Sequence, residues 1–179
     1  MDEVYRTVLG HFRHEIGHYY WEQLIKDTNR LQPFRKLFGD ERIDYAEALK
    51  QHYNETTSNI WSEKFISAYA STHPWEDWAE TWAHYMHIVD TMETAYSFGM
   101  TLNPRSADPE NEMSARLNID PYTTKIFEDI IERWIPLSFV MNSLNRSMGL
   151  KDSYPFVINE AVKQKLNFIH ETIRGEGRT

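Results

Sequence analysis

The stretch that decides both the fold and the chemistry of this chain is Arg13-His14-Glu15-Ile16-Gly17-His18. Four residues advance a helix by about 400° at 3.6 residues per turn, so His14 and His18 share one face, one turn apart. At that spacing two neutral imidazoles reach a single tetrahedral Zn²⁺. Glu15 projects beside the metal, where its carboxylate can take a proton from a water that the metal activates. The stretch therefore predicts half of a zinc site on a helix.

The residues on either side predict that this helix runs from about residue 2 to about residue 26 and is buried. It would carry large apolar side chains on two faces: Tyr5, Val8, Leu9, Phe12, Ile16, Tyr19 and Tyr20 on one, and Trp21 and Ile25 beside the histidines on the other. A helix that is apolar on both sides is normally buried. Buried imidazoles need partners, because an unpaired buried polar group costs about 1–3 kcal/mol. A pair of hydrogen-bonded core histidines is the alternative that these residues leave open.

Composition indicates a single packed domain over residues 1–179, with a hydrophobic fraction of 41%. The 19 basic and 27 acidic residues give a net charge of −8, which argues against a nucleic-acid or anionic-membrane partner. The chain has no cysteine, which excludes disulfides and thiolate metal sites. We see no secretory signal pattern and no apolar run near the roughly 18 residues of a membrane span, so we expect a cytoplasmic protein.

Start and stop signals along the rest of the chain predict a mainly α protein. The expected helices cover residues 35–38, 45–53, 62–69, 75–96, 121–148 and 159–174. Residues 100–121 are polar and show no periodicity, so we expect a long loop there, and a flexible tail at 175–179. There is no internal repeat, no convincing hairpin and no alternation of strands with helices, which indicates an essentially all-α architecture.

A catalytic zinc site needs a third protein ligand and an open position. A third histidine six residues beyond His18 is excluded because Leu24 stands there. The helix expected over 75–96 offers carboxylates instead, and its polar side contains no Lys or Arg, which is unusual for a solvated face and typical of a metal site. That side carries Glu76, Glu80, Ala83, His87 and Asp90. We predict Glu76 as the ligand and Glu80, one turn later, as the acceptor of a hydrogen bond from a ligand imidazole.

The pair of motifs resembles the gluzincin arrangement of metallopeptidases. The stretch Trp75-Glu76-Asp77-Trp78-Ala79-Glu80 is similar to the ligand helix of lethal-factor-type metalloproteases. In those enzymes a tyrosine seven residues before the ligand glutamate helps to stabilise the oxyanion, and the resemblance implies this role for Tyr69. The alternative for Tyr69 is a core phenol with a satisfied hydroxyl.

Over nearly its whole length the chain also resembles a bacterial family of zinc-binding metallopeptidases that carry an N-terminal zinc ribbon. The resemblance lies in residues 11–21, 67–69, 73–84 and 144–149. Members have a Cys-rich ribbon and a β-rich region before the histidine helix, whereas this chain starts 13 residues before His14. We therefore expect a helical zincin-type catalytic domain whose upstream β-region is absent or minimal, as in a C-terminal fragment or a shortened homologue. The metal ligands would survive that loss, but the peptide subsites that an edge strand provides would not.

Together these features predict a zinc metallopeptidase that acts on a peptide or protein substrate. Zn²⁺ would be held by His14, His18 and Glu76, with Glu15 as general base and Tyr69 as oxyanion donor. Two alternatives remain at this point. One is a non-catalytic zinc-binding interaction domain or an inactive fragment of a larger metallopeptidase, and the other is a helical domain without a metal.

Overall fold

The computed structural model describes residues 7–54, 59–105 and 113–175. The chain divides into two compact units, unit 1 with Met1–Met86 and Phe156–Thr179, and unit 2 with His87–Pro155. Within the described ranges six α-helices and two short strands form, so the prediction of a mainly α fold is confirmed. The prediction of a single domain over 1–179 stays a prediction.

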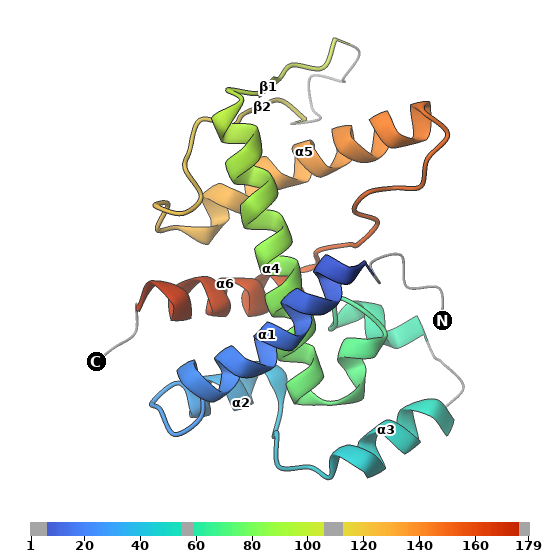
Figure 1. Ribbon diagram of the computed structural model, residues 1–179, viewed down its shortest axis with the longest axis vertical. Helices are drawn as coiled ribbons and strands as arrows, with labels where there is room; N and C mark the ends of the chain where they lie inside the picture. The colour runs from blue at the N-terminus through green and yellow to red at the C-terminus, as the bar shows by residue number, and fades with distance from the viewer. Residues whose placement is uncertain (1–6, 55–58, 106–112, 176–179) are drawn as a thin grey trace. The chain divides into compact units, whose positions relative to one another are not determined.

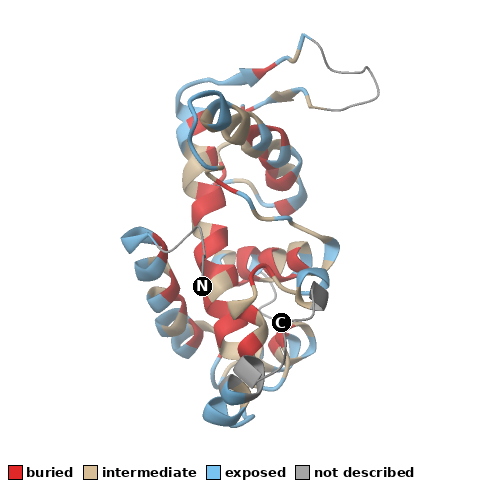
Figure 2. Cartoon of the chain, turned by 90° about the vertical axis from the view of Figure 1, so that its right-hand side faces the viewer, coloured by how far each residue is buried: buried red, intermediate tan, exposed pale blue. Residues whose placement is uncertain are grey.

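Unit 1 is built around the first half of the helix α4. Its elements are α1 (Val8–Leu24), α2 (Leu31–Phe38), α3 (Tyr45–Asn54), η1 (Asn59–Glu63), η2 (Tyr69–Thr72), the first part of α4 (Pro74–Ser97) and α6 (Glu160–Arg174). Helix α1 crosses α4 (Figure 1), and the fully buried Trp78 donates a hydrogen bond from Nε1 to the carbonyl of Gly17 at 2.9 Å. Buried residues follow one another along α4 (Figure 2), as expected for a helix covered from several sides.

Helix α1 begins at Val8, so the predicted start near residue 2 is wrong. Thr7 has an extended backbone, and its hydroxyl accepts a hydrogen bond from the Gly10 N–H at 2.9 Å. This N-cap satisfies a backbone donor that has no partner inside the helix, and thereby fixes the first turn. The other end agrees with the predicted break, because the helix stops at Leu24 and Asp27 takes a positive φ of 56°.

The prediction that α1 is buried on both sides is also wrong. Among its large apolar residues, Val8, Leu9, Phe12 and Tyr19 are exposed, whereas His14, Gly17 and Trp21 are buried. Helix α1 therefore buries only the face that carries His14, Gly17 and Trp21. Apolar residues recur at helical spacing on both faces, but this periodicity does not determine which face another element of the fold covers.

A buried ion pair joins α4 to α6. Lys165 Nζ lies 2.6 Å from Asp77 Oδ2 and donates to the Lys64 carbonyl at 2.7 Å. Burial raises the pKa of Asp77 to about 7, against the opposing effect of the Lys165 ammonium. Removing either partner would leave a buried charge without compensation. The pair thus fixes α4 at Asp77, next to the predicted ligand Glu76.

Unit 2 contains the rest of α4 from His87, the strands β1 (Thr101–Leu102) and β2 (Ala115–Arg116), and α5 (Phe127–Ser147). The strands pair antiparallel inside the segment that we predicted to be a loop without a hairpin. Two-residue strands are too short to show an alternating pattern in the sequence.

At the C-terminus, Gly175 ends α6 in the left-handed region with φ 72°, and residues 176–179 of the predicted tail lie outside the described residues. Among the described helices, none has both the length and the apolar character needed to cross a membrane.

Candidate metal centre

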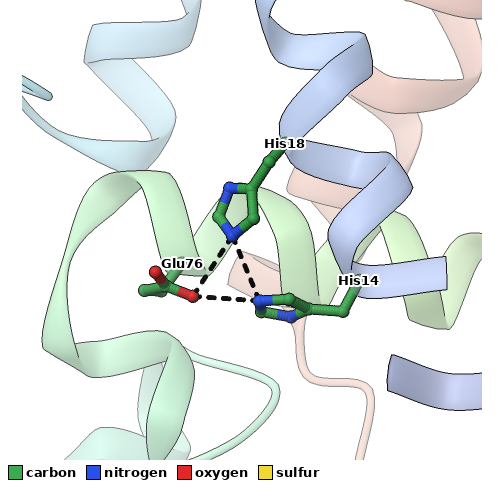
Figure 3. Close-up of side chains that lie close together, drawn as sticks. All are labelled: His14, His18 and Glu76. Atoms are coloured by element: carbon green, nitrogen blue, oxygen red, sulfur yellow. Dashed lines mark hydrogen bonds and ion pairs between the residues drawn. The ribbon is translucent and has the colours of Figure 1, made fainter. Parts of the chain in front are cut away.

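Three side chains from two helices meet at one point. His14 and His18 extend from α1 and Glu76 extends from α4 toward them (Figure 3). His14 Nε2 lies 3.2 Å from His18 Nε2 and 3.0 Å from Glu76 Oε2, and His18 Nε2 lies 3.5 Å from the same oxygen. Ligand atoms at 2.0–2.1 Å from a tetrahedral zinc ion are about 3.3–3.4 Å apart. The three atoms therefore have the spacing of one face of a zinc coordination tetrahedron.

The chemistry of the three atoms also favours a cation. The Nδ1 atom of His14 lies 2.7 Å from Glu80 Oε1, so it carries a proton, and the Nε2 atom of a neutral ring then presents a lone pair. Glu76 Oε2 is a buried oxygen whose close polar neighbours, within the described residues, are the two imidazole nitrogens at 3.0 and 3.5 Å. Two nitrogens and one carboxylate oxygen suit Zn²⁺, although other divalent metals accept the same set.

Glu80 contacts the cluster through His14 Nδ1, the ring nitrogen that does not face Glu76. Its Oε1 accepts the hydrogen bond from His14 Nδ1, and its Oε2 accepts one from the Ser67 hydroxyl at 2.8 Å. The Ser67 oxygen in turn accepts a hydrogen bond from the Ala70 N–H at 3.1 Å. Both carboxylate oxygens are therefore held, which fixes the orientation and tautomer of the His14 ring.

Glu15 and Tyr69 lie outside this three-residue cluster. The Glu15 side chain is 58% exposed, and its carboxylate is 3.7 Å from His11 Nε2. The Tyr69 ring centre lies 5.9 Å from that of His14, and its hydroxyl oxygen is 3.5 Å from the hydroxyl oxygen of Tyr45. The structure thus brings His14, His18, Glu76 and Glu80 into contact and places Tyr69 beside them. Glu15 occupies the exposed side of the same helix turn.

Comparison with known families gives the site a context. The sequence model of the family described as "Putative zinc-binding metallo-peptidase" matches residues 1–172. The chain belongs to this family. The finer resemblance to gluzincins and to lethal-factor-type enzymes stays a prediction.

The relatives that match this chain carry names that state no function. They include Uncharacterized protein Mb2598c of Mycobacterium bovis and the Uncharacterized proteins MT2644 and Rv2568c of Mycobacterium tuberculosis. Each is 46% identical over 174 residues, which cover 97% of this chain and 48% of the relative. The chain therefore spans about half the length of the curated relatives it matches. No solved structure matches the chain.

Three residues near the cluster of His14, His18 and Glu76 were not predicted from the sequence. Tyr45 donates a hydrogen bond to Glu76, Ser67 donates one to Glu80, and Gly17 lies against α4. Gly17 stands inside the histidine motif, so its position could have drawn attention. Ser67 lies in one of the stretches that carry the family resemblance, but Tyr45 carries no local signal, because it reaches the site from a segment that shares no periodicity with the ligands.

Replacing Gly17 by alanine is expected to weaken both the fold and zinc binding. A Cβ atom at Gly17 would lie 3.0 Å from Ala79 Cα and 3.1 Å from Trp82 Cβ, so α1 would have to move away from α4. Overpacking lowers the free energy of unfolding by about 1–3 kcal/mol, and the better helix propensity of alanine raises it by about 1 kcal/mol. We therefore expect a net loss of stability of up to ~2 kcal/mol. Urea unfolding of the metal-free protein and a zinc titration measure the two effects. A variant that is more stable and binds zinc like the wild type would contradict this close-contact role.

The metal-free protein is expected to lose stability at alkaline pH. Burial lowers the pKa of His14, but hydrogen bonds to Glu76 and Glu80 outweigh it and raise the pKa from 6.5 to about 9. Burial likewise opposes ionisation of Glu76, yet hydrogen bonds from His14 and His18 hold its pKa well below the usual range. Both pKa shifts reflect the same interaction between His14 and Glu76, so its contribution to stability is counted only once. The folded state binds the His14 proton more tightly than the unfolded chain does, so this stabilisation is complete below pH 6.5 and disappears as the pH rises through about 9.

The size of this effect is about 3 kcal/mol, from about 1.4 kcal/mol for each tenfold change in proton affinity. Urea unfolding of chelator-treated protein across that pH range measures it. His14→Ala is the control, because it should lack the His14 contribution. Equal pH dependence in the two proteins would contradict the assignment.

Proposed function

We propose that this chain is a zinc-dependent metallopeptidase domain that hydrolyses peptide bonds in a peptide or protein substrate. His14, His18 and Glu76 would hold the metal, Glu15 would act as general base and Tyr69 would stabilise the oxyanion. The observation that carries this proposal is the convergence of three ligand atoms from α1 and α4 at separations of 3.0–3.5 Å. Family membership supports the same reaction class.

Each residue of the site has a distinct task in this mechanism. Bound zinc supplies Lewis acidity, which polarises the scissile carbonyl and acidifies water. The Glu15 carboxylate accepts the proton of the attacking water and returns it to the leaving amine. The Tyr69 hydroxyl donates a hydrogen bond to the carbonyl oxygen as negative charge develops there. Glu80 keeps the proton on His14 Nδ1, so that His14 Nε2 retains its lone pair for the metal.

A second candidate is a zinc-binding interaction domain without catalysis. The observation that favours it is the exposure of Glu15, whose side chain is 58% accessible. Beside it on α1, Val8, Phe12 and Tyr19 are exposed as well. A general base gains strength from a site that excludes water, and this exposed surface does not provide one by itself.

Two measurements separate these functions. Metal analysis of protein purified without added zinc should find stoichiometric zinc in the wild type and little in His14→Ala. Hydrolysis of a mixed peptide library, followed by mass spectrometry with and without a chelator, should find cleavage that the chelator abolishes. Absence of zinc would leave only a helical domain without a metal. Zinc without chelator-sensitive cleavage would favour the interaction domain.

A further inference from the structure

The two carboxylate oxygens of Glu76 have different environments. Oε2 faces the imidazoles, at 3.0 Å from His14 Nε2 and 3.5 Å from His18 Nε2. Oε1 accepts a hydrogen bond of 2.9 Å from the hydroxyl of Tyr45. Glu76 is only 3% exposed, whereas Tyr45 is 39% exposed. The phenol of Tyr45 thus reaches a buried carboxylate from the surface and contributes to its orientation.

We propose, on the basis of the zinc site put forward above, that Tyr45 is a positioning residue that restricts Glu76 to one coordinating oxygen. A carboxylate can bind a metal through one oxygen or through both. If Oε1 also turned toward the ion, it would take up the position that a catalytic zinc site leaves open for water or substrate. The hydrogen bond from Tyr45 occupies Oε1 and opposes that rotation.

The segment before α3 holds Tyr45 in place. His73 Nδ1 accepts a hydrogen bond from the Trp75 N–H at 3.0 Å, so the ring proton is on Nε2, which donates to the Ile43 carbonyl at 3.2 Å. The ring of Tyr45 packs edge-on against His73, with 5.3 Å between ring centres. His73 directly precedes α4, the helix that carries Glu76. The same histidine thus ties the backbone beside Tyr45 to the start of the ligand helix.

Tyr45 also links the ligand to the predicted oxyanion donor. The hydroxyl of Tyr45 has a single proton, which it gives to the Glu76 carboxylate. The two phenol oxygens are 3.5 Å apart, so any hydrogen bond between them has Tyr69 as the donor and Tyr45 as the acceptor. Loss of the Tyr45 oxygen would remove this contact together with the hydrogen bond to Glu76.

Tyr45→Phe tests this role, because it removes only the hydroxyl. We expect zinc affinity, measured by competition with a chromophoric chelator, to fall about 10–100-fold, as for other residues that orient metal ligands. In the cobalt-substituted protein we expect weaker visible absorption, because Co²⁺ with more than four ligands absorbs less strongly than tetrahedral Co²⁺. The matched control is Tyr122→Phe, which removes a phenol–carboxylate hydrogen bond of 2.6 Å to Asp90 in unit 2.

The outcomes separate this role from the proposed function. Zinc affinity and cobalt absorption in Tyr45→Phe equal to those of the wild type, or losses no larger than in Tyr122→Phe, would overturn the role of Tyr45. Circular dichroism of both metal-free variants shows whether the fold is retained. If wild-type protein binds zinc but cleaves no peptide, the peptidase proposal fails while the test of Tyr45 remains decisive. If wild-type protein binds no zinc, both fail.

Discussion

Glu15→Gln is expected to lower peptide hydrolysis by about 10²–10⁴-fold while zinc content stays that of the wild type. An amide has nearly the shape of a carboxylate, but it cannot accept the proton of the attacking water. The Glu15 side chain is 58% exposed and its carboxylate lies 3.7 Å from His11 Nε2, so the exchange disturbs neither the core nor the three ligand atoms. Initial rates on a peptide that the wild type cleaves, together with zinc per chain by mass spectrometry, measure the two effects.

The matched control is Glu22→Gln on the same helix, which removes an exposed ion pair of 2.6 Å with Lys26. Such an exposed pair contributes little to stability, so activity and zinc content should both be retained. Equal rates for wild type and Glu15→Gln that a chelator does not reduce would end the peptidase proposal. Loss of zinc in Glu15→Gln would instead show that Glu15 supports the metal rather than the proton transfer.

The second large effect is expected at the two acidic residues of α4, which should differ sharply in their importance for zinc. Glu76 Oε2 lies 3.0 Å and 3.5 Å from the two imidazole nitrogens, so Glu76→Gln removes the charge of a proposed direct ligand. Glu80 contacts the metal site only through His14 Nδ1, at 2.7 Å, and Glu80→Gln keeps an oxygen that can accept this bond. We expect a loss of affinity of about 10–100-fold for Glu80→Gln and a clearly larger loss for Glu76→Gln.

Zinc competition titrations on both variants at one pH measure this difference. The pH must be held constant, because zinc and a proton compete for His14. Comparable losses, or a larger loss at Glu80, would mean that the two roles are reversed. Thermal unfolding of the metal-free variants shows whether either exchange acts through the fold instead.

The sequence was informative where the chemistry is local. The spacing of His14 and His18 and the absence of Lys and Arg from one side of α4 both follow from helical periodicity, and the structure brings residues from these two patterns together. The exposed face of α1 could not be predicted, because the sequence shows that a face is apolar but not whether another element covers it. Tyr45 reaches Glu76 from 31 residues away, and only the three-dimensional arrangement of α3 and α4 reveals that contact.

The buried pair of Asp77 and Lys165 has a consequence for the order in which this protein folds. Its partners are 88 residues apart in the chain, Trp78 and Gly17 are 61 apart, and His14 and Glu80 are 66 apart. Contacts between residues so far apart in the sequence form only after a large loop has closed, and closing that loop costs conformational entropy. Contacts of this kind slow folding. The proposed ligands consequently come together only when α1 has docked on α4. In a chain that is still being synthesised this can happen before α6 exists, whereas the Asp77–Lys165 pair that fixes α4 closes only once α6 is present.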